Sequence, residues 1–299
     1  MTAKQNDLQG IIIKGIGGFY YVETANQVFE CKARGILRKN NITPLAGDKV
    51  LISIGKDETG VIEQILDRKN FLIRPPVANI DQLFIVSSVL EPEPNILLVD
   101  KLISICEYKG IKPILIFSKT DISDADKFYD IYKNTGYLIY TFSREETKDI
   151  KKIKVYIKGK LSAFTGNSGV GKSTLINAID PSLNLKTSEI SKKLGRGRHT
   201  TREAVLLKTC DGYVIDTPGF SSLELVDCDI LKKEKLADTF IEFKEYLGKC
   251  KFASCSHTCE KGCTVVEAVN KNKINASRHQ SYIALYEQLK QIKPWELKR

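Results

Sequence analysis

Long apolar runs are missing from this sequence of 299 residues. No uninterrupted run approaches the roughly 20 residues that a membrane-spanning helix needs, so we expect no membrane partner. The first ten residues, MTAKQNDLQG, lack the apolar core of a secretory signal, and we therefore expect a cytoplasmic protein. Internal repeats, low-complexity segments and heptads are also absent. Nothing in the sequence demands a second copy, so we expect a monomer.

Acidic residues are in deficit, with 36 Asp and Glu against 46 Lys and Arg. The resulting net charge of +10 suggests a polyanionic partner, although basic proteins without such a partner are also common. The hydrophobic fraction of 42% and the charged fraction of 27% are typical of globular chains. A chain of this length has room for about two to three domains.

The eight cysteines are distributed unevenly along the chain. Cys250, Cys255, Cys259 and Cys263 fall within 14 residues. In a reducing cytosol, a cluster of this density indicates a metal site rather than disulfides.

Residues 1–67 consist of short apolar stretches divided by turn residues. The expected strands are residues 10–15, 19–23, 27–33, 49–55 and 60–66. Five short strands at this spacing predict a small β-barrel of the OB type. The loop after the third strand carries basic side chains that are candidate RNA contacts, namely Lys32, Arg34, Arg38 and Lys39. A charge run alone favours the alternative of a solvated loop, and the barrel context strengthens the case for RNA contact.

Residues 68–225 alternate strand and helix patterns. The expected strands are residues 81–90, 112–118, 137–143, 160–166, 203–209 and 212–218. The expected helices are residues 95–110, 124–136 and 171–179. This alternation predicts an α/β domain whose mostly parallel sheet is covered by helices on both faces.

Residues 226–299 are rich in helix patterns around the cysteine cluster. Tyr282, Leu285, Tyr286 and Leu289 recur at helical spacing, which predicts a packing stripe. A base-stacking role for the two tyrosines is the alternative.

A phosphate-binding pattern, G-x-x-x-x-G-K-[ST], lies between an expected strand and an expected helix. The candidate GTP-binding residues here are Gly166, Asn167, Ser168, Gly169, Val170, Gly171, Lys172, Ser173 and Thr174. Glycine frees successive N–H groups to wrap phosphates, Lys172 neutralises phosphate oxygens, and the Ser173 hydroxyl ligates Mg²⁺. The position of the pattern, after a strand and before a helix, makes a chance match improbable.

Two further segments complete the expected phosphate site. Asp216 ends a strand as part of Asp216-Thr217-Pro218-Gly219, where it can hold magnesium and where the Gly219 N–H can face the γ-phosphate. Residues 195–202, GRGRHTTR, lie between the two motifs, and we interpret them as a switch. Thr200 or Thr201 is the candidate for the threonine that caps the magnesium.

A base-reading segment follows the strand 112–118. It comprises Ser118, Lys119, Thr120 and Asp121. A carboxylate can accept both donors on the guanine edge, which adenine does not offer, so Asp121 with Lys119 favours GTP over ATP. Residues 140–143 form a weaker candidate for a second base-contact loop.

The base-reading segment precedes the phosphate loop, whereas an ordinary Ras-like GTPase has the reverse order. Circular permutation explains this order when the original termini lie close together. The motif order, GNSGVGKST, GRGRHTT, DTPGF and C-x4-C-x-H-x5-C together resemble the ribosome small subunit-dependent GTPase A family over essentially the whole chain.

This resemblance implies a circularly permuted GTPase that acts late in maturation of the small (30S) ribosomal subunit. It implies binding to the subunit and its 16S rRNA, hydrolysis stimulated by the subunit, and help in releasing assembly factors. Ser118 stands where asparagine or threonine is usual in the family, which points to a lower guanine affinity.

Hydrolysis must proceed without the usual glutamine, because Phe220 follows the DTPG glycine. We therefore predict slow intrinsic turnover, with a catalytic group delivered by the switch or by the RNA. His199 is the candidate for positioning or deprotonating the attacking water, and an RNA-contacting or solvent-facing histidine is the alternative.

The cysteine cluster supplies three thiolates and one imidazole, a closed tetrahedral set suited to one structural Zn²⁺. The expected ligands are Cys250, Cys255, His257 and Cys263. The family pattern omits the position of Cys259, so Cys259 is excluded.

Two other functions remain open from the sequence. One is an RNA-binding assembly module with little nucleotide turnover, against which the intact Lys172, Ser173 and Asp216 argue. The other is an ATP-using enzyme such as a small-molecule kinase, against which Lys119 and Asp121 argue.

Overall fold

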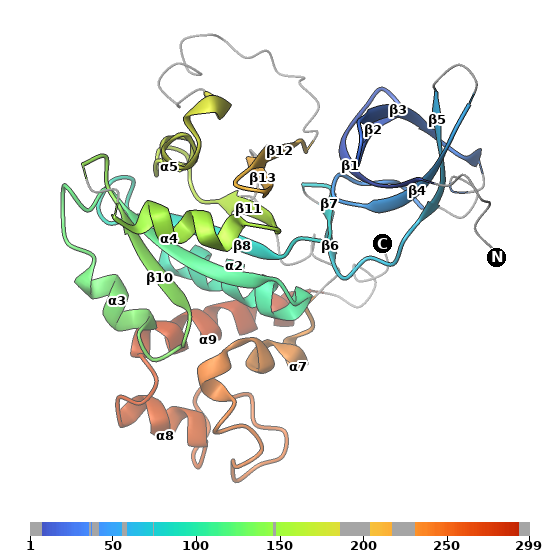
Figure 1. The fold of residues 1–299 in the computed structure, drawn as a ribbon. Coiled ribbons are helices and arrows are strands. Elements are labelled where there is room, and N and C mark those ends of the chain that lie inside the picture. The colour runs from blue at the N-terminus through green and yellow to red at the C-terminus, as the bar shows by residue number, and fades with distance from the viewer. Residues whose placement is uncertain are drawn as a thin grey trace.

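The computed structural model describes residues 8–35, 37, 42–55, 59–73, 75–145, 148–185, 204–216 and 231–292. Along the chain it forms a barrel, an α/β part and a helical part, as Figure 1 shows in blue, teal to gold, and orange to red. No helix of these residues combines the length and the apolar character that crossing a membrane requires.

The five predicted N-terminal strands are confirmed and close into a barrel. They are β1 (Leu8–Ile16), β2 (Phe19–Thr24), β3 (Val28–Ala33), β4 (Lys49–Ile54) and β5 (Gly60–Ile65). The strand order is β1-β2-β3-β5-β4, in which only β3 and β5 pair in parallel. Alternate residues such as Ile12, Val22 and Ile52 fill the interior, because side chains along a strand point to opposite faces. The predicted OB-type barrel is therefore present.

A short two-stranded sheet connects the barrel to the α/β part. It consists of β6 (Phe71–Leu72) and β7 (Val77–Ala78), which the sequence pattern did not predict. At this junction Gly47 has a φ of 89°, and a Cβ there would lie 2.2 Å from the Ala78 carbonyl oxygen. Only glycine therefore allows the barrel to approach so closely.

The central sheet has six strands. They are β8 (Gln82–Ser88), β9 (Lys112–Ser118), β10 (Leu138–Phe142), β11 (Leu161–Thr165), β12 (Leu206–Thr209) and β13 (Gly212–Asp216). The order is β10-β9-β8-β11-β13-β12, and every pairing is parallel except that of β12 with β13. The strands β8 to β10 and the strands β12 and β13, which follow the phosphate loop, lie on opposite sides of β11, the strand that leads into the loop. One sheet thus contains both parts of the chain, as circular permutation predicts.

Helices cover both faces of this sheet, as predicted. Helices α2 (Ile96–Lys109) and α3 (Asp126–Tyr132) pack on one face, and α4 (Lys148–Ile157) and α5 (Lys172–Ile179) pack on the other. The short 3-10 helix η1 (Pro181–Leu183) follows α5. Helix α2 begins where the Asn95 side chain accepts the Leu98 N–H and ends at left-handed Gly110.

The C-terminal part is helical and shares a core with the α/β part. It contains α7 (Lys233–Leu236), η4 (Ala237–Thr239), η5 (Ile241–Phe243), α8 (Thr264–Asn270) and α9 (Ala276–Gln291). Helix α9 lies against α2 below the sheet (Figure 1), and its predicted packing stripe is confirmed, with Tyr282, Leu285 and Leu289 buried in that core. The helical part is therefore attached to the sheet through an apolar interface.

Candidate functional site

The predicted nucleotide-binding segments meet at one edge of the central sheet. In the parallel register, Ser118 at the end of β9 pairs with Ser88 of β8 and with Phe142 of β10. On the other side of β8, Phe164 of β11 pairs with Asp216 at the end of β13. The carboxyl ends of parallel strands share one edge, which is where such sheets bind their ligands.

The loop from Gly166 to Gly171 has a backbone that requires glycine. Gly166, Gly169 and Gly171 have φ values of 147°, 85° and 93°. A Cβ on Gly166 would lie 2.1 Å from the Val86 carbonyl oxygen. Helix α5 starts directly after the loop, so its unpaired N–H groups and its dipole favour an anion at this place.

The Lys172 ammonium lies across this loop. Its Nζ donates to the carbonyl oxygens of Gly166 at 2.7 Å and Asn167 at 2.8 Å. Ser168 and Gly169 are exposed at the tip of the loop, while Val170 is buried in the core beside α5. Ser173 and Thr174 follow in the first turn of α5 and are half-buried.

The base-reading segment is bonded to the phosphate loop through Ser118. Its buried hydroxyl lies 2.6 Å from the Val170 carbonyl oxygen and 3.2 Å from that of Ser87, and it can donate to either. The main-chain N–H of Lys119 donates to the Phe142 carbonyl at 2.8 Å. Ser118 thus makes a hydrogen bond across the site, although it stands where asparagine or threonine is usual in the family.

The side chains of the base-reading segment lie beyond the end of β9, at the edge of the sheet. The Lys119 ammonium donates to the Glu91 carbonyl oxygen in the loop that follows β8. Lys119 itself has a φ of 64°, which turns the chain away from β9. Thr120 is half-buried and Asp121 is exposed, so the Asp121 carboxylate is accessible to a ligand.

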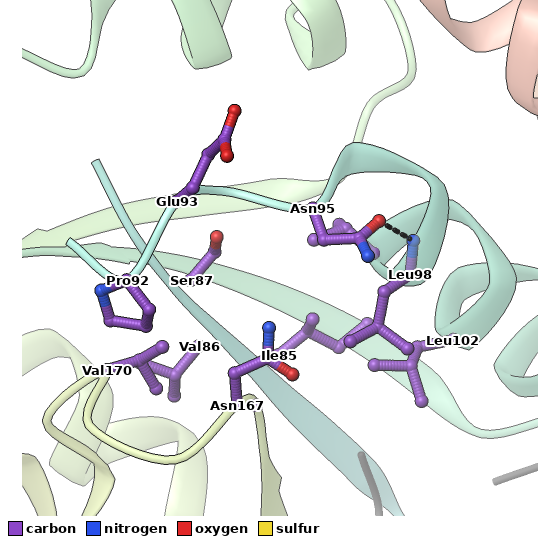
Figure 2. A pocket seen from close by; sticks show the side chains of 12 residues that line it. Ile85, Val86, Ser87, Pro92, Glu93, Asn95, Leu98, Leu102, Asn167 and Val170 are labelled. Carbon is purple, nitrogen blue, oxygen red and sulfur yellow. Dashed lines mark hydrogen bonds between the residues drawn. The ribbon is translucent and has the colours of Figure 1, made fainter. Parts of the chain in front are cut away.

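A cavity of about 10 Å³ lies behind the phosphate loop, between the loop and the start of α2. Val86, Asn95, Asn167 and Val170 help to line it, and Figure 2 shows Glu93 pointing away from it. This volume is about that of one water molecule, so a nucleotide would have to lie on the open edge instead.

The predicted metal ligands form a compact group. The ligand atoms of Cys250, Cys255, His257 and Cys263 all lie within 4.8 Å of one another. The Cys250 Sγ lies 3.9 Å from the Cys263 Sγ and 3.5 Å from the His257 Nδ1. A tetrahedral zinc site separates its ligand atoms by roughly 3.5–3.8 Å, so these residues fit zinc. Cys259 is exposed and outside the group.

Residues around this group fix its loop, and the sequence analysis did not identify them. The His279 Nε2–H donates to the His257 carbonyl at 2.8 Å, and the Tyr282 hydroxyl donates to the Ser256 carbonyl at 2.7 Å. The Glu260 carboxylate accepts the main-chain N–H groups of Ser256 and Thr258. Burial lowers the pKa of His257, which keeps its imidazole in the neutral form that metals bind.

Family models match both the barrel and the α/β part of the chain. Residues 9–62 match the RsgA N-terminal domain, and residues 65–226 match the RsgA GTPase. The chain belongs to the RsgA GTPase family.

Named relatives of this family cover nearly the whole chain. It is 44% identical to the small ribosomal subunit biogenesis GTPase RsgA 2 of Oceanobacillus iheyensis, over 96% of this chain and 99% of the relative. It is also 44% identical to an RsgA of Caldanaerobacter subterraneus, over 95% and 96% of the two chains.

Two solved structures share the fold. One is YloQ, described as a circularly permuted GTPase, with a TM-score of 0.80, 35% identity and coverage of 98% and 99% of the two chains. The other is YjeQ from Thermotoga maritima, with a TM-score of 0.82, 34% identity and coverage of 96% and 100%. The predicted RsgA-type fold is confirmed: an OB-like barrel, a circularly permuted GTPase domain and a helical part with a cysteine and histidine cluster.

Several predicted site residues of this RsgA-family chain lie outside the described residues. They are His199, Thr200, Thr201, Gly219, Phe220, Arg38 and Lys39. For Asp216 the description covers the main chain, which ends β13 beside Phe164.

Two of the candidate RNA contacts in the barrel are described. Arg34 forms an ion pair with Glu63 at 2.6 Å and remains 61% exposed. The Lys32 ammonium lies 5.1 Å from the centre of the Phe19 ring. Both side chains are accessible, and Arg34 already shares its charge with an acid.

Proposed function

We propose that this chain hydrolyses GTP during biogenesis of the small ribosomal subunit, and that the subunit stimulates this hydrolysis. The observation that carries the proposal is the Ser118 hydroxyl bonded to Val170, which joins a guanine-reading segment to a phosphate loop. The name of the RsgA relatives supports the biological setting, since they match over nearly the full chain. Release of assembly factors and a cytoplasmic, monomeric state belong to the same proposal.

Within this function, the roles of the nucleotide-site residues follow from their chemistry. The loop from Gly166 to Thr174 wraps the phosphates, and Asp121 with Lys119 reads the guanine edge. Ser173 and Asp216 hold Mg²⁺, which neutralises the charge that develops on the phosphate oxygens. The position of these residues at one sheet edge supports the assignment.

The switch and the partner supply the catalytic group, because Phe220 cannot orient water. His199 positions or deprotonates the attacking water, and Thr200 or Thr201 caps the magnesium. Turnover of His199→Ala with purified small subunits tests this role. Stimulated turnover equal to that of the unchanged protein would end it.

The remaining assignments concern structure and docking. One structural Zn²⁺ is held by Cys250, Cys255, His257 and Cys263, and the mutual distances of their ligand atoms support it. In the barrel, the residues Lys32, Arg34, Arg38 and Lys39 contact 16S rRNA. We place the domain limits at residues 1–67, 68–225 and 226–299.

The function is tested by measuring GTP and ATP turnover with and without purified small ribosomal subunits. We expect slow GTP turnover alone, clear stimulation by subunits, and no ATP turnover. Lys172→Ala should abolish the activity, since it removes the charge that neutralises the phosphates. Preference for ATP would contradict the proposal, and binding of subunits without turnover would indicate an RNA-binding assembly module instead.

A further inference from the structure

The exposed side of helix α4 carries lysines and a single apolar residue. Its exposed residues are Lys148, Lys151, Lys152 and Val155, and Lys158 is exposed directly after the helix. These five residues are called the lysine face below. The opposite side of the helix, with Ile150, Ile153 and Ile157, is buried in the core against α5.

Several lysines in or directly after other surface helices of the described chain pair with acids. Lys133, directly after α3, pairs with Asp130, and Lys271, directly after α8, pairs with Glu267. Within α9, Lys290 pairs with Glu287. Such pairs are typical of a helix surface that faces only water. On α4 the corresponding pair is Lys152–Asp149 at 2.8 Å.

Two lysines of the lysine face do not pair with an acid in the part of the chain that the structure describes. Within the described residues, no acidic side chain lies within 4.0 Å of the Lys148 or Lys151 ammonium. Both belong to the first turn of α4, where the helix dipole disfavours a positive charge. The unfavourable interaction of these two charges with the helix dipole is offset if they face an anionic partner.

The positive surface continues beyond α4. Lys158 lies 3.6 Å from Asp211, an exposed pair that water screens. The ammonium groups of Lys112 and Lys160 lie 5.3 Å and 5.6 Å from the centre of the Tyr156 ring. Lysines from three segments of the chain thus gather on this side of the sheet, which is opposite to α2 and α9 (Figure 1).

We propose that the lysine face binds the sugar-phosphate backbone of RNA. The source of that RNA, the small ribosomal subunit, rests on the proposed function. Flexible ammonium groups in a row suit repeated phosphates, and each contact releases condensed counterions. A basic amphipathic helix can also lie on an anionic membrane, but it must then insert its apolar side. Here that side is buried in the protein core, and Val155 alone is exposed, so RNA is favoured.

Hydrogen bonds connect α4 through β10 to the guanine-reading segment. The Asp149 carboxylate of α4 accepts the Thr141 N–H of β10 at 3.2 Å. The next residue, Phe142, accepts the Lys119 N–H at 2.8 Å. These two hydrogen bonds connect α4 to the segment that precedes Asp121.

The test compares two triple variants with the same loss of charge. One removes the lysine face by Lys148→Gln, Lys151→Gln and Lys158→Gln. The control changes the paired lysines by Lys133→Gln, Lys271→Gln and Lys290→Gln. Affinity for purified small subunits and for a generic RNA duplex is measured over a series of KCl concentrations, and circular dichroism with the melting temperature confirms that each variant is folded.

We expect the lysine-face variant to bind subunits at least roughly tenfold more weakly than the control. The slope of log affinity against log salt should fall by about three, or about one for each lysine. Affinity and slope equal to those of the control would overturn the inference. So would binding to anionic phosphatidylserine vesicles that depends on the lysine face, since it would assign the face to a membrane.

The duplex separates this inference from the proposed function. If the unchanged protein binds no subunits but binds the duplex with a lysine-dependent slope, the function fails and the lysine face stands. If it binds neither, both proposals fall.

Discussion

The Ser118 hydroxyl is the one side-chain group that joins β9 to the carbonyl of Val170 in the phosphate loop among the described residues. Ser118→Ala would leave this buried carbonyl without that donor. The loss would destabilise the loop conformation that binds GDP by roughly 1–2 kcal/mol of free energy. We therefore expect GDP to bind roughly 5- to 30-fold more weakly, measured by titration with a fluorescent GDP analogue. Ser104→Ala is the control, because its buried hydroxyl donates to the main-chain carbonyl of Asp100 within α2, away from the phosphate loop. Equal affinities in the two variants would refute the joining role.

Asp121 is exposed at the sheet edge and governs the choice of base if our proposal holds. Asp121→Asn replaces an acceptor by an amide that also donates, which suits the second carbonyl of xanthine and not the amino group of guanine. We expect GTP affinity to fall by roughly 100-fold or more, because a site built around hydrogen bonds rejects the mismatched base. XTP should bind more tightly than GTP to this variant. Retained GTP preference would place the base elsewhere.

Some residues of the site carry a sequence signal and others do not. The phosphate loop was predictable because its glycines, lysine and serine are demanded by the geometry of phosphate binding. The contact of Lys119 with Glu91 was not, because it uses a main-chain carbonyl that every residue has. For the same reason the sequence did not predict the roles of His279 and Tyr282, which donate hydrogen bonds to carbonyls of the loop with the cysteine and histidine cluster.

At the scale of elements, strands were predicted better than short helices. The strands carry continuous apolar runs bounded by turns, and their positions are confirmed. Helix α4 was missed even though Ile150, Ile153 and Ile157 recur at helical spacing, because its lysines dominate the composition. The strands β6 and β7 have two residues each and owe their pairing to the junction with the barrel, so no local pattern could predict them.

The loop that carries the cysteine and histidine cluster has no regular structure, and we expect its conformation to depend on bound metal. Cys263 is buried at the start of α8, whereas Cys259 is exposed. Cys263→Ser should lower the zinc content from one ion per chain to near zero, because it removes one of four ligands, while Cys259→Ser should keep it. Atomic absorption measures both. Loss of zinc in Cys259→Ser would show that the ligand set is wrong.

A chelator tests the same element in the unchanged protein. Metal binding contributes directly to folding where the ligands have no other means of being held together. Removal of zinc should therefore lower the melting temperature of the protein, because the loop is attached to the core that α2, α8 and α9 share. Addition of the chelator to Cys263→Ser should not lower the melting temperature of that variant any further.

For the whole molecule, the sequence predicted which parts exist but not how they are joined. The barrel has its own core, whereas residues of α2, α3, α8 and α9 share a single core. Polar contacts fasten the barrel to the sheet: the Glu23 carboxylate accepts the Tyr213 hydroxyl at 2.8 Å and pairs with Lys208. Residues so far apart in sequence give no local signal of their contact.

A buried ionic network connects the GTPase part to the C-terminal part. Arg278 of α9 donates to Asp100 of α2 at 2.6 Å and to Glu242 of η5 at 2.7 Å. The Tyr132 hydroxyl of α3 donates to the same Asp100 at 2.8 Å. The exposed fractions of the three charged side chains are 1%, 0% and 6%. Helices α2 and α3 are thus fixed to α9, the helix that contacts the loop with the cysteine and histidine cluster.

Arg278→Ala should destabilise the whole connection between the GTPase part and the C-terminal part. It leaves two buried carboxylates without their cation, which costs roughly 3–5 kcal/mol in unfolding free energy. Guanidinium denaturation measures the loss, and Lys290→Ala, an exposed change on the same helix, is the control with an expected loss near zero. Because α2, α3 and α9 share one core, hydrogen exchange should accelerate in all three together while the barrel strands keep their protection. Faster exchange in α9 alone would mean that the two parts are stable independently.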